Sequence, residues 1–194
     1  MKFNNIFFIT SVLVIVFTFG YLGQVKSEKT HDFSSFVDNE GKISLPTGFR
    51  ENWEYLGAWV VPERPDGTKS DGYGFHDVFT SPGSIEKFDK NTKTFADGSV
   101  IVKEVRSIDS ASMTTGPLVM FAGEEILWFV MIKDEKGRYK DNPNWGDGWG
   151  WALFLADDKT KNVSTNYKKD CIGCHIPAKK DDWIYLQGYP VLEK

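Results

Sequence analysis

The sequence predicts an α+β fold, namely a predominantly antiparallel β-sheet domain with a few short helices and a C-terminal segment that carries a Cys-x-x-Cys-His motif. Three observations favour this class. Short runs of aromatic and β-branched residues recur along the chain, clusters of Gly, Pro, Asp and Ser separate them, and few stretches have a helical period. With 194 residues, the chain has room for one domain of this kind.

Short apolar runs are expected to form the strands of this sheet. In chain order they cover residues 53–61, 73–80, 98–106, 118–121, 126–132 and 149–155. Each run is rich in residues that fit a pleated surface, and turn-forming residues lie between the runs. Several short strands at this spacing are typical of an antiparallel domain and not of a helical bundle.

Short helical segments are expected at two places. Ser81-Pro82 is a typical helix start and apolar residues three apart follow it, so a short helix is expected over residues 81–91. A second helical turn should carry the C-terminal motif and end at Pro177. The tail at residues 181–192 is too apolar for a loose end, and we expect it to pack beside the motif.

The first part of the chain is expected to be a signal peptide or an N-terminal membrane anchor, at residues 1–27. Residues 3–25 carry no charge and are long enough to span a bilayer, while cleavage after Ser27 would suit a secretory signal. Residues 28–35 should be a polar tether, and residues 36–194 the folded domain. The domain is therefore expected to be exported to the periplasm, either soluble or tethered to the membrane.

The charge of the chain argues against a nucleic-acid partner. The formal net charge is −4, and it is more negative without the N-terminal segment, because Lys2 and Lys26 lie there. No basic stripe remains that would follow a phosphate backbone. We therefore expect no nucleic-acid binding.

The motif Cys171-Ile172-Gly173-Cys174-His175 contains both cysteines of the chain and one of its three histidines. This spacing is the attachment signature of c-type haem. The thiols of Cys171 and Cys174 would form thioether bonds to the haem vinyl groups, and His175 would be the metal ligand on the iron. We expect one covalent haem c per chain, with a backbone carbonyl just past His175 accepting the hydrogen bond from its other ring nitrogen.

Other interpretations of the two cysteines remain open. A thioredoxin-like dithiol usually follows a βαβ pattern, which is missing before this motif. A structural zinc site needs four ligands, and only His31 and His76 are left as further histidines. A simple disulfide would leave His175 unexplained. Haem attachment accounts for all three side chains of the motif.

An ordered set of short motifs resembles the cytochrome P-460 family, which also includes the β-sheet cytochromes c′-beta. The set is Leu45-Pro46, Val100-Ile101-Val102-Lys103-Glu104, Trp151-Ala152-Leu153-Phe154, Cys171 to His175, and Tyr189-Pro190-Val191-Leu192. The resemblance covers nearly the whole domain. It implies a β-rich haem protein, a homodimer in many members, with one axial histidine and an open distal face.

The resemblance gives Lys103 a role in catalysis and in cofactor binding. In the P-460 members a lysine is bonded to a porphyrin meso carbon and the enzyme oxidises hydroxylamine, and Lys103 stands at the position of that lysine. Strand alternation places Lys103 on the same face as Ile101 and Val105. A charged side chain on such an apolar face is unexpected unless it has a function. The alternative is a snorkelling side chain whose ammonium reaches water.

His76 is the second candidate for a catalytic role. Aligned with the family through Val78 and Pro82, it stands by resemblance where the hydroxylamine-oxidising relatives carry a distal arginine. The resemblance implies that an imidazole there would exchange protons with a bound nitrogen compound. A lone histidine in such a strand is, on its own, more often a surface or a satisfied core residue. No role is assigned to Asp77, Glu104, Glu124 or Glu125.

The methionines are not expected to act as iron ligands. Met120 and Met131 lie in apolar strands and are expected to fill the core. Without a sixth ligand the iron would keep an open coordination position opposite His175.

The resemblance implies a redox enzyme that oxidises hydroxylamine or a related small nitrogen compound opposite His175. Its partners would be that substrate and an external electron acceptor such as another cytochrome. Members without the lysine bond bind nitric oxide or carbon monoxide, so a gas sensor or scavenger is the first alternative. A plain electron-transfer cytochrome is the second.

Overall fold

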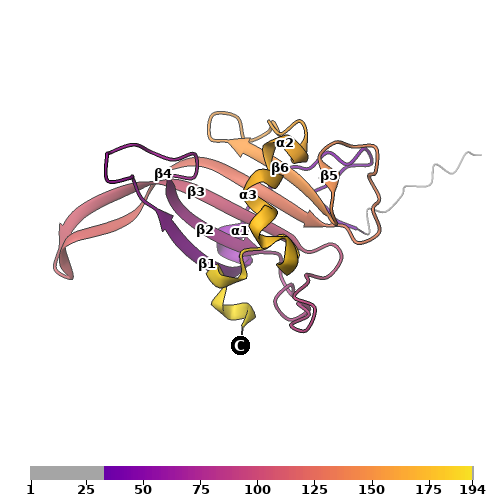
Figure 1. Cartoon of the computed structure of the whole chain (residues 1–194), viewed down its shortest axis with the longest axis horizontal. Helices are drawn as coiled ribbons and strands as arrows, with labels where there is room; N and C mark the ends of the chain where they lie inside the picture. Colours follow the sequence, from indigo (N-terminus) through magenta and orange to yellow (C-terminus); the bar gives the residue numbers. More distant parts are fainter. Residues whose placement is uncertain (1–32, 194) are drawn as a thin grey trace, which may run out of the picture. The chain divides into compact units, whose positions relative to one another are not determined.

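A six-stranded antiparallel sheet forms the centre of the computed structural model, which describes residues 33–193 (Figure 1). In sheet order the strands are β1 (Glu54–Val61), β2 (Gly74–Thr80), β3 (Val100–Met113), β4 (Gly116–Lys133), β6 (Trp149–Leu155) and β5 (Trp145–Gly146). Every neighbouring pair of strands is antiparallel. The predicted fold class is therefore confirmed.

The helices are all short, and most of them lie near the C-terminal end of the chain. They are α1 (Phe49–Asn52), α2 (Tyr167–Asp170), α3 (Ile172–His175) and the 3₁₀ helices η1 (Ile176–Asp181), η2 (Leu186–Gly188) and η3 (Pro190–Leu192). Within residues 33–193, no helix is long and apolar enough to cross a membrane. The segment expected to be a signal or anchor, residues 1–27, and most of the expected tether lie outside the described residues.

Two expectations about individual elements are wrong. The runs 118–121 and 126–132 belong to one continuous strand, β4, because the backbone stays extended through Gly123 while the pairing with β3 shifts register. The helix expected over residues 81–91 is a series of turns. There the Glu54 carboxylate accepts hydrogen bonds from the backbone N–H groups of Gly83 and Ile85, at 3.1 and 2.9 Å. Such a side-chain acceptor competes with helical hydrogen bonding.

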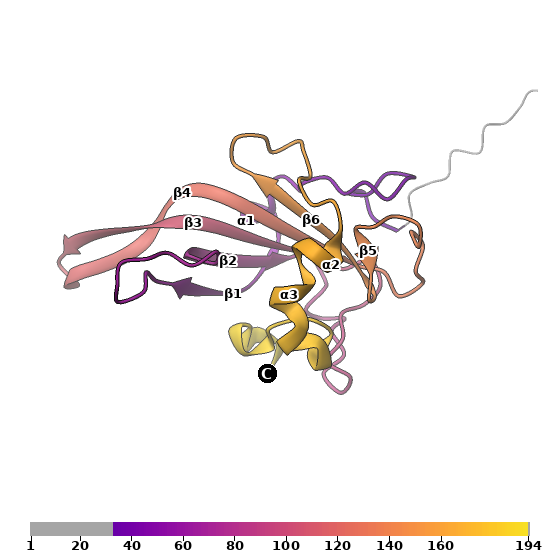
Figure 2. The same cartoon turned by 45° about the horizontal axis from the view of Figure 1, so that its top comes forward.

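Strands β3 and β4 extend beyond the rest of the sheet as a two-stranded arm, residues 107–125 (Figures 1 and 2). Strand β2 pairs with β3 only up to Arg106, and β6 pairs with β4 only from Leu127 onward. Within the described chain, neither edge of the arm therefore has a neighbouring strand. Leu118 is 64% exposed and Met120 is 51% exposed.

Apolar layers cover both faces of the sheet, as the alternation of β3 requires. The first, here called the C-terminal layer, consists of Leu56, Val78, Phe88, Phe95, Ile101, Met131, Trp149, Trp151, Tyr167, Cys171, Trp183, Ile184, Tyr189 and Leu192. The second, the N-terminal layer, consists of Val37, Ile43, Phe49, Val100, Val102, Trp128, Val130, Ile132, Trp145, Ala152 and Phe154. Ile101 thus faces the C-terminal segment, while its neighbours Val100 and Val102 face the opposite way.

The C-terminal tail sits against β1 through a contact between two glycines. A Cβ atom added to Gly57, at the register shift in β1, would overlap the carbonyl oxygen of Gly188. Trp59 then packs over Gly188 and lies 5.8 Å from the Tyr189 ring. The tail at residues 181–192 therefore packs beside the motif, as expected.

Candidate haem site

Helices α2 and α3, which carry the Cys-x-x-Cys-His motif, cross one face of the sheet (Figure 2). Asn166 caps α2, since its side chain accepts a hydrogen bond from the backbone N–H of Lys168 at 3.0 Å. The Asp170 carboxylate accepts from the N–H groups of Thr165 and Asn166, which closes the preceding turn. The helical turn at the motif is therefore confirmed. Pro177 does not end it, because the chain continues as η1 with this proline in its first turn.

His175 is held in one orientation. Its Nδ1 donates a hydrogen bond to the carbonyl oxygen of Trp183 at 2.7 Å. The acceptor is a backbone carbonyl, as expected, but it lies eight residues beyond His175 and not just past the motif. The ring also makes an edge contact with Trp151 at 4.9 Å between centroids and lies 6.0 Å from Tyr185. Burial lowers the pKa of His175 to about 4, so the imidazole is neutral. The remaining nitrogen, Nε2, is free to bind iron.

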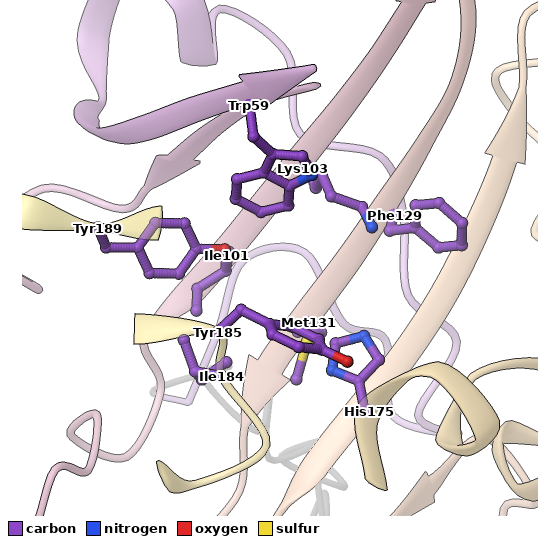
Figure 3. Close-up of a pocket in the computed structure, with 9 residues that line it drawn as sticks. All are labelled: Trp59, Ile101, Lys103, Phe129, Met131, His175, Ile184, Tyr185 and Tyr189. Atoms are coloured by element: carbon purple, nitrogen blue, oxygen red, sulfur yellow. The ribbon is translucent and has the colours of Figure 1, made fainter. Parts of the chain in front are cut away.

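A small hollow of about 30 Å³ lies between helix α3, the C-terminal tail and the sheet (Figure 3). Its lining consists of Trp59, Ile101, Lys103, Phe129, Met131, His175, Ile184, Tyr185 and Tyr189. Apart from the tyrosine hydroxyls and the indole N–H of Trp59, only Lys103 and His175 bring polar groups to a wall that is otherwise aromatic and aliphatic. Such a wall suits a flat, mostly apolar ligand. The donor set, two thiols and a neutral imidazole, fits haem c.

Lys103 reaches this hollow from the middle of β3, and Figure 3 shows its side chain and that of His175 directed into the same space. Its Nζ lies 4.3 Å from the centroid of the Phe129 ring, its cross-strand partner on β4. Burial lowers the pKa of Lys103 to about 8, against the opposing effect of Cys174 and Cys171. About a tenth of the amine is therefore neutral at pH 7.

His76 lies on β2, beside this hollow but not in its lining. The side chain is 4% exposed, and its ring packs 5.5 Å from that of Trp59, its cross-strand partner. Nε2 donates to the carbonyl oxygen of Gly72 at 2.8 Å, whereas Nδ1 is buried with no hydrogen-bond partner in the described part of the chain. Burial, helped by the charge of Lys103, lowers the pKa of His76 to about 4. The ring is thus neutral, with an unused lone pair on Nδ1.

The two cysteines differ in exposure. Cys171 is buried in the C-terminal layer, Cys174 is exposed, and both are free. Burial raises the pKa of the Cys171 thiol to about 11, whereas a redox-active dithiol depends on a lowered pKa. Within residues 33–193 no three His, Cys, Asp or Glu side chains form a metal-binding group. The dithiol and zinc interpretations therefore have little support.

None of the four carboxylates considered from the sequence lines the hollow. Glu104 is buried on the opposite face of the sheet, where it pairs with Arg50 and accepts a hydrogen bond from the Trp128 indole at 3.2 Å. Asp77 accepts from the Tyr55 hydroxyl at 3.2 Å. Of the methionines, Met131 is buried and lines the hollow. Met120 is exposed on the arm, so the expectation that it fills the core is wrong.

Sequence reasoning missed an ion pair next to the site. Lys133, which the sequence indicates only as the start of a turn, is buried and pairs with Asp182 at 2.6 Å. The two residues are far apart in the chain, so no spacing signal reveals the contact. The individual wall residues Trp59 and Tyr185 were also not predicted, although the apolar composition of the tail indicated that it would pack here.

Comparison with known proteins agrees with this geometry. A family model described as Cytochrome P460 matches residues 46–186. The matched range includes Lys103, His76 and the complete Cys-x-x-Cys-His motif. A search of curated proteins found no match.

Proposed function

Because the chain belongs to the cytochrome P460 family, we propose that it is an exported, periplasmic protein with one covalent haem c that oxidises hydroxylamine or a related small nitrogen compound. The observation that carries this proposal is the placement of Lys103 and His175 in the wall of one hollow. A gas-binding or electron-carrying haem protein needs no lysine there, whereas the hydroxylamine-oxidising members of the family have one.

The residues of the motif divide the task of holding the group. Cys171 and Cys174 would anchor it through thioether bonds, and His175 Nε2 would ligate its iron while Nδ1 stays bonded to Trp183. The bound haem would supply a redox-active iron with one coordination position open to a small molecule. Trp59, Phe129 and the other apolar wall residues would exclude water from this position.

Oxidation of hydroxylamine releases protons as well as electrons. Loss of two electrons and two protons converts NH₂OH to HNO, so the bound haem would supply the redox centre and an external acceptor such as another cytochrome would take the two electrons. His76 has an unused Nδ1 lone pair in a buried place beside the hollow, and this lone pair can accept a proton, although the lowered pKa makes the ring a weak base. We assign this role to His76, because no carboxylate lines the hollow.

Lys103 is proposed to form a third covalent bond to the haem, from Nζ to a meso carbon. The new C–N bond replaces one N–H and one C–H bond, so two protons and two electrons must leave, and maturation requires a two-electron oxidant such as a peroxide. The partly neutral amine favours this reaction because only the unprotonated nitrogen is a nucleophile. The bond would distort the macrocycle and change the electronic properties of the iron.

One observation favours a second function. The wall of the hollow is mostly apolar, and such a wall also suits nitric oxide or carbon monoxide. A protein of this kind would be a gas sensor or scavenger with an unmodified porphyrin. It would bind gas tightly and show no turnover.

The arm at residues 107–125 is proposed as the contact of a homodimer. Residues 110–123 carry no charge, and Leu118 and Met120 are more than half exposed. An isolated two-stranded hairpin with exposed apolar side chains is marginal by itself. A second copy of the same arm would cover these side chains. Because this surface carries no charge, two copies of it would not repel each other.

The test is steady-state turnover of hydroxylamine by the purified holoprotein with an artificial electron acceptor. The proposal expects turnover that depends on His175 and on His76. A rate no higher than that of the His175→Ala variant would overturn it. The absorption spectrum of the ferrous protein separates the alternatives: a cross-linked haem gives a displaced and broadened Soret band, and a six-coordinate carrier gives sharp low-spin bands.

A further inference from the structure

The chain takes an unusual backbone conformation immediately before the acceptor of the His175 hydrogen bond. Asp182 and Trp183 have φ angles of 55° and 67°, and both are therefore in the left-handed region. Asparagine and aspartate visit this region at modest cost, but a bulky residue such as tryptophan is an outlier there. Strained backbone of this kind persists only where the surrounding structure holds it, and it is concentrated at functional sites.

The surrounding structure holds Asp182 with a buried ion pair. Lys133 Nζ lies 2.6 and 2.8 Å from the two carboxylate oxygens of Asp182, and the side chains of the two residues are 7% and 9% exposed. The indole of Trp149 donates a hydrogen bond to the carbonyl oxygen of Asp182 at 3.0 Å. Lys133 is the last residue of β4 and Trp149 the first of β6, so both anchors belong to the sheet. The strained segment is thus fastened to the most rigid part of the fold.

This fastening determines where the next carbonyl points. The oxygen of Trp183 accepts from His175 Nδ1 at 2.7 Å, a short N–H···O contact. We infer that the Lys133–Asp182 ion pair is a positioning device that holds the Trp183 carbonyl against His175 and thereby strengthens the imidazole as an iron ligand. The inference rests on the proposed function only in taking His175 as that ligand.

The physical basis is the response of imidazole to its second hydrogen bond. A firmly held acceptor on Nδ1–H fixes the tautomer and the ring angle and increases electron donation from Nε2 to the metal. Stronger donation stabilises the oxidised iron more than the reduced iron and lowers the reduction potential. Removing the ion pair would release the carbonyl, weaken the donation and raise the potential.

The experiment measures the midpoint potential of the holoprotein and its Asp182→Asn and Lys133→Gln variants. Loss of outer-shell support typically costs about tenfold or more in metal affinity. If oxidised iron bears a tenfold loss that reduced iron does not, the potential rises by about 59 mV for one electron. Both variants should shift the potential upward by this order. The ferrous nitrosyl form should also lose the His175 ligand more readily, which its electron paramagnetic resonance spectrum reports.

Asp181→Asn is the matched control. Asp181 precedes Asp182 and its side chain also forms an ion pair, but with the exposed Lys93 at 3.1 Å. Only its backbone carbonyl, which the substitution keeps, contacts the acceptor peptide, through a hydrogen bond from the Ile184 N–H at 3.0 Å. The midpoint potential of the Asp181→Asn variant should equal that of the unaltered protein. A general effect of removing negative charge near the iron would shift this control as well and would overturn the inference.

A further measurement needs no substitution. In the unaltered holoprotein the Nδ1 proton of His175 should exchange slowly with solvent, because a held carbonyl protects it; rapid exchange would contradict the inference even if the variants failed to fold. An unchanged potential in Asp182→Asn would also overturn it. The proposed function fails in a different way, namely if the holoprotein turns over hydroxylamine no faster than the His175→Ala variant while the potentials shift as expected.

Discussion

Because of His76, the folded protein should lose stability as the pH falls from 6.5 to 4. The ring is 4% exposed, and burial followed by the charge of Lys103 lowers its pKa from 6.5 to about 4. In this window the unfolded chain binds the proton and the folded chain does not, so the free energy of unfolding rises with pH. The loss relative to pH 8 is about 2 kcal/mol at pH 5 and about 3 kcal/mol at pH 4, from the shift and 1.36 kcal/mol per pKa unit.

The assay is urea unfolding of the holoprotein at a series of pH values, compared with a His76→Gln variant. Glutamine can still donate to the Gly72 carbonyl but does not titrate, so effects of other acids and bases cancel between the two proteins. The stability lost between pH 8 and pH 5 should be about 2 kcal/mol smaller in the variant. Equal losses in both proteins would refute the assignment of His76 as a buried neutral base.

Four substitutions test other parts of the account. Glu104→Gln should cost about 3 kcal/mol of stability in thermal or urea unfolding, because it leaves the groups that Glu104 binds unpaired in the interior. Glu125→Gln breaks a partly exposed pair with the same residue, Arg50, and should cost less than about 1 kcal/mol. Similar costs for the two variants would contradict the reasoning. Gly57→Ala should destabilise the holoprotein by about 1–3 kcal/mol, since its Cβ overlaps the Gly188 carbonyl; an unchanged melting temperature would show that the tail is not held there. Leu118→Glu should convert a dimer into monomers by light scattering, and an unchanged mass would remove the arm from the interface.

The sheet could be predicted because its signals are local. The central run at residues 98–106 has alternating faces and β-branched residues, and it forms the core of β3. The interruption of β4 was misread, because Gly123 and the acidic pair after it resemble a turn. In the folded chain Gly123 allows the close approach of Ser107, whose hydroxyl accepts from the Glu124 N–H at 2.8 Å. This hydrogen bond comes from the partner strand β3, so the sequence of β4 alone does not reveal it.

The site divides in the same way. Cys171, Cys174 and His175 are defined by spacing alone, and the pocket face of Lys103 follows from strand alternation. The pairing of Lys133 with Asp182 depends on how the tail folds back onto the end of β4, which no local pattern specifies. Long-range contacts between charged residues carry no periodicity, and for this reason the anchoring of the iron ligand became evident only from the structure.

Peptide mapping of the proteolysed holoprotein by mass spectrometry tests the central claim most directly. The account predicts one haem mass joined to the peptide that contains Cys171 and Cys174, and also to the peptide that contains Lys103. Haem bonded to the two cysteines alone would contradict the lysine bond and favour the gas-binding alternative. A motif peptide without haem would contradict the whole assignment of the site.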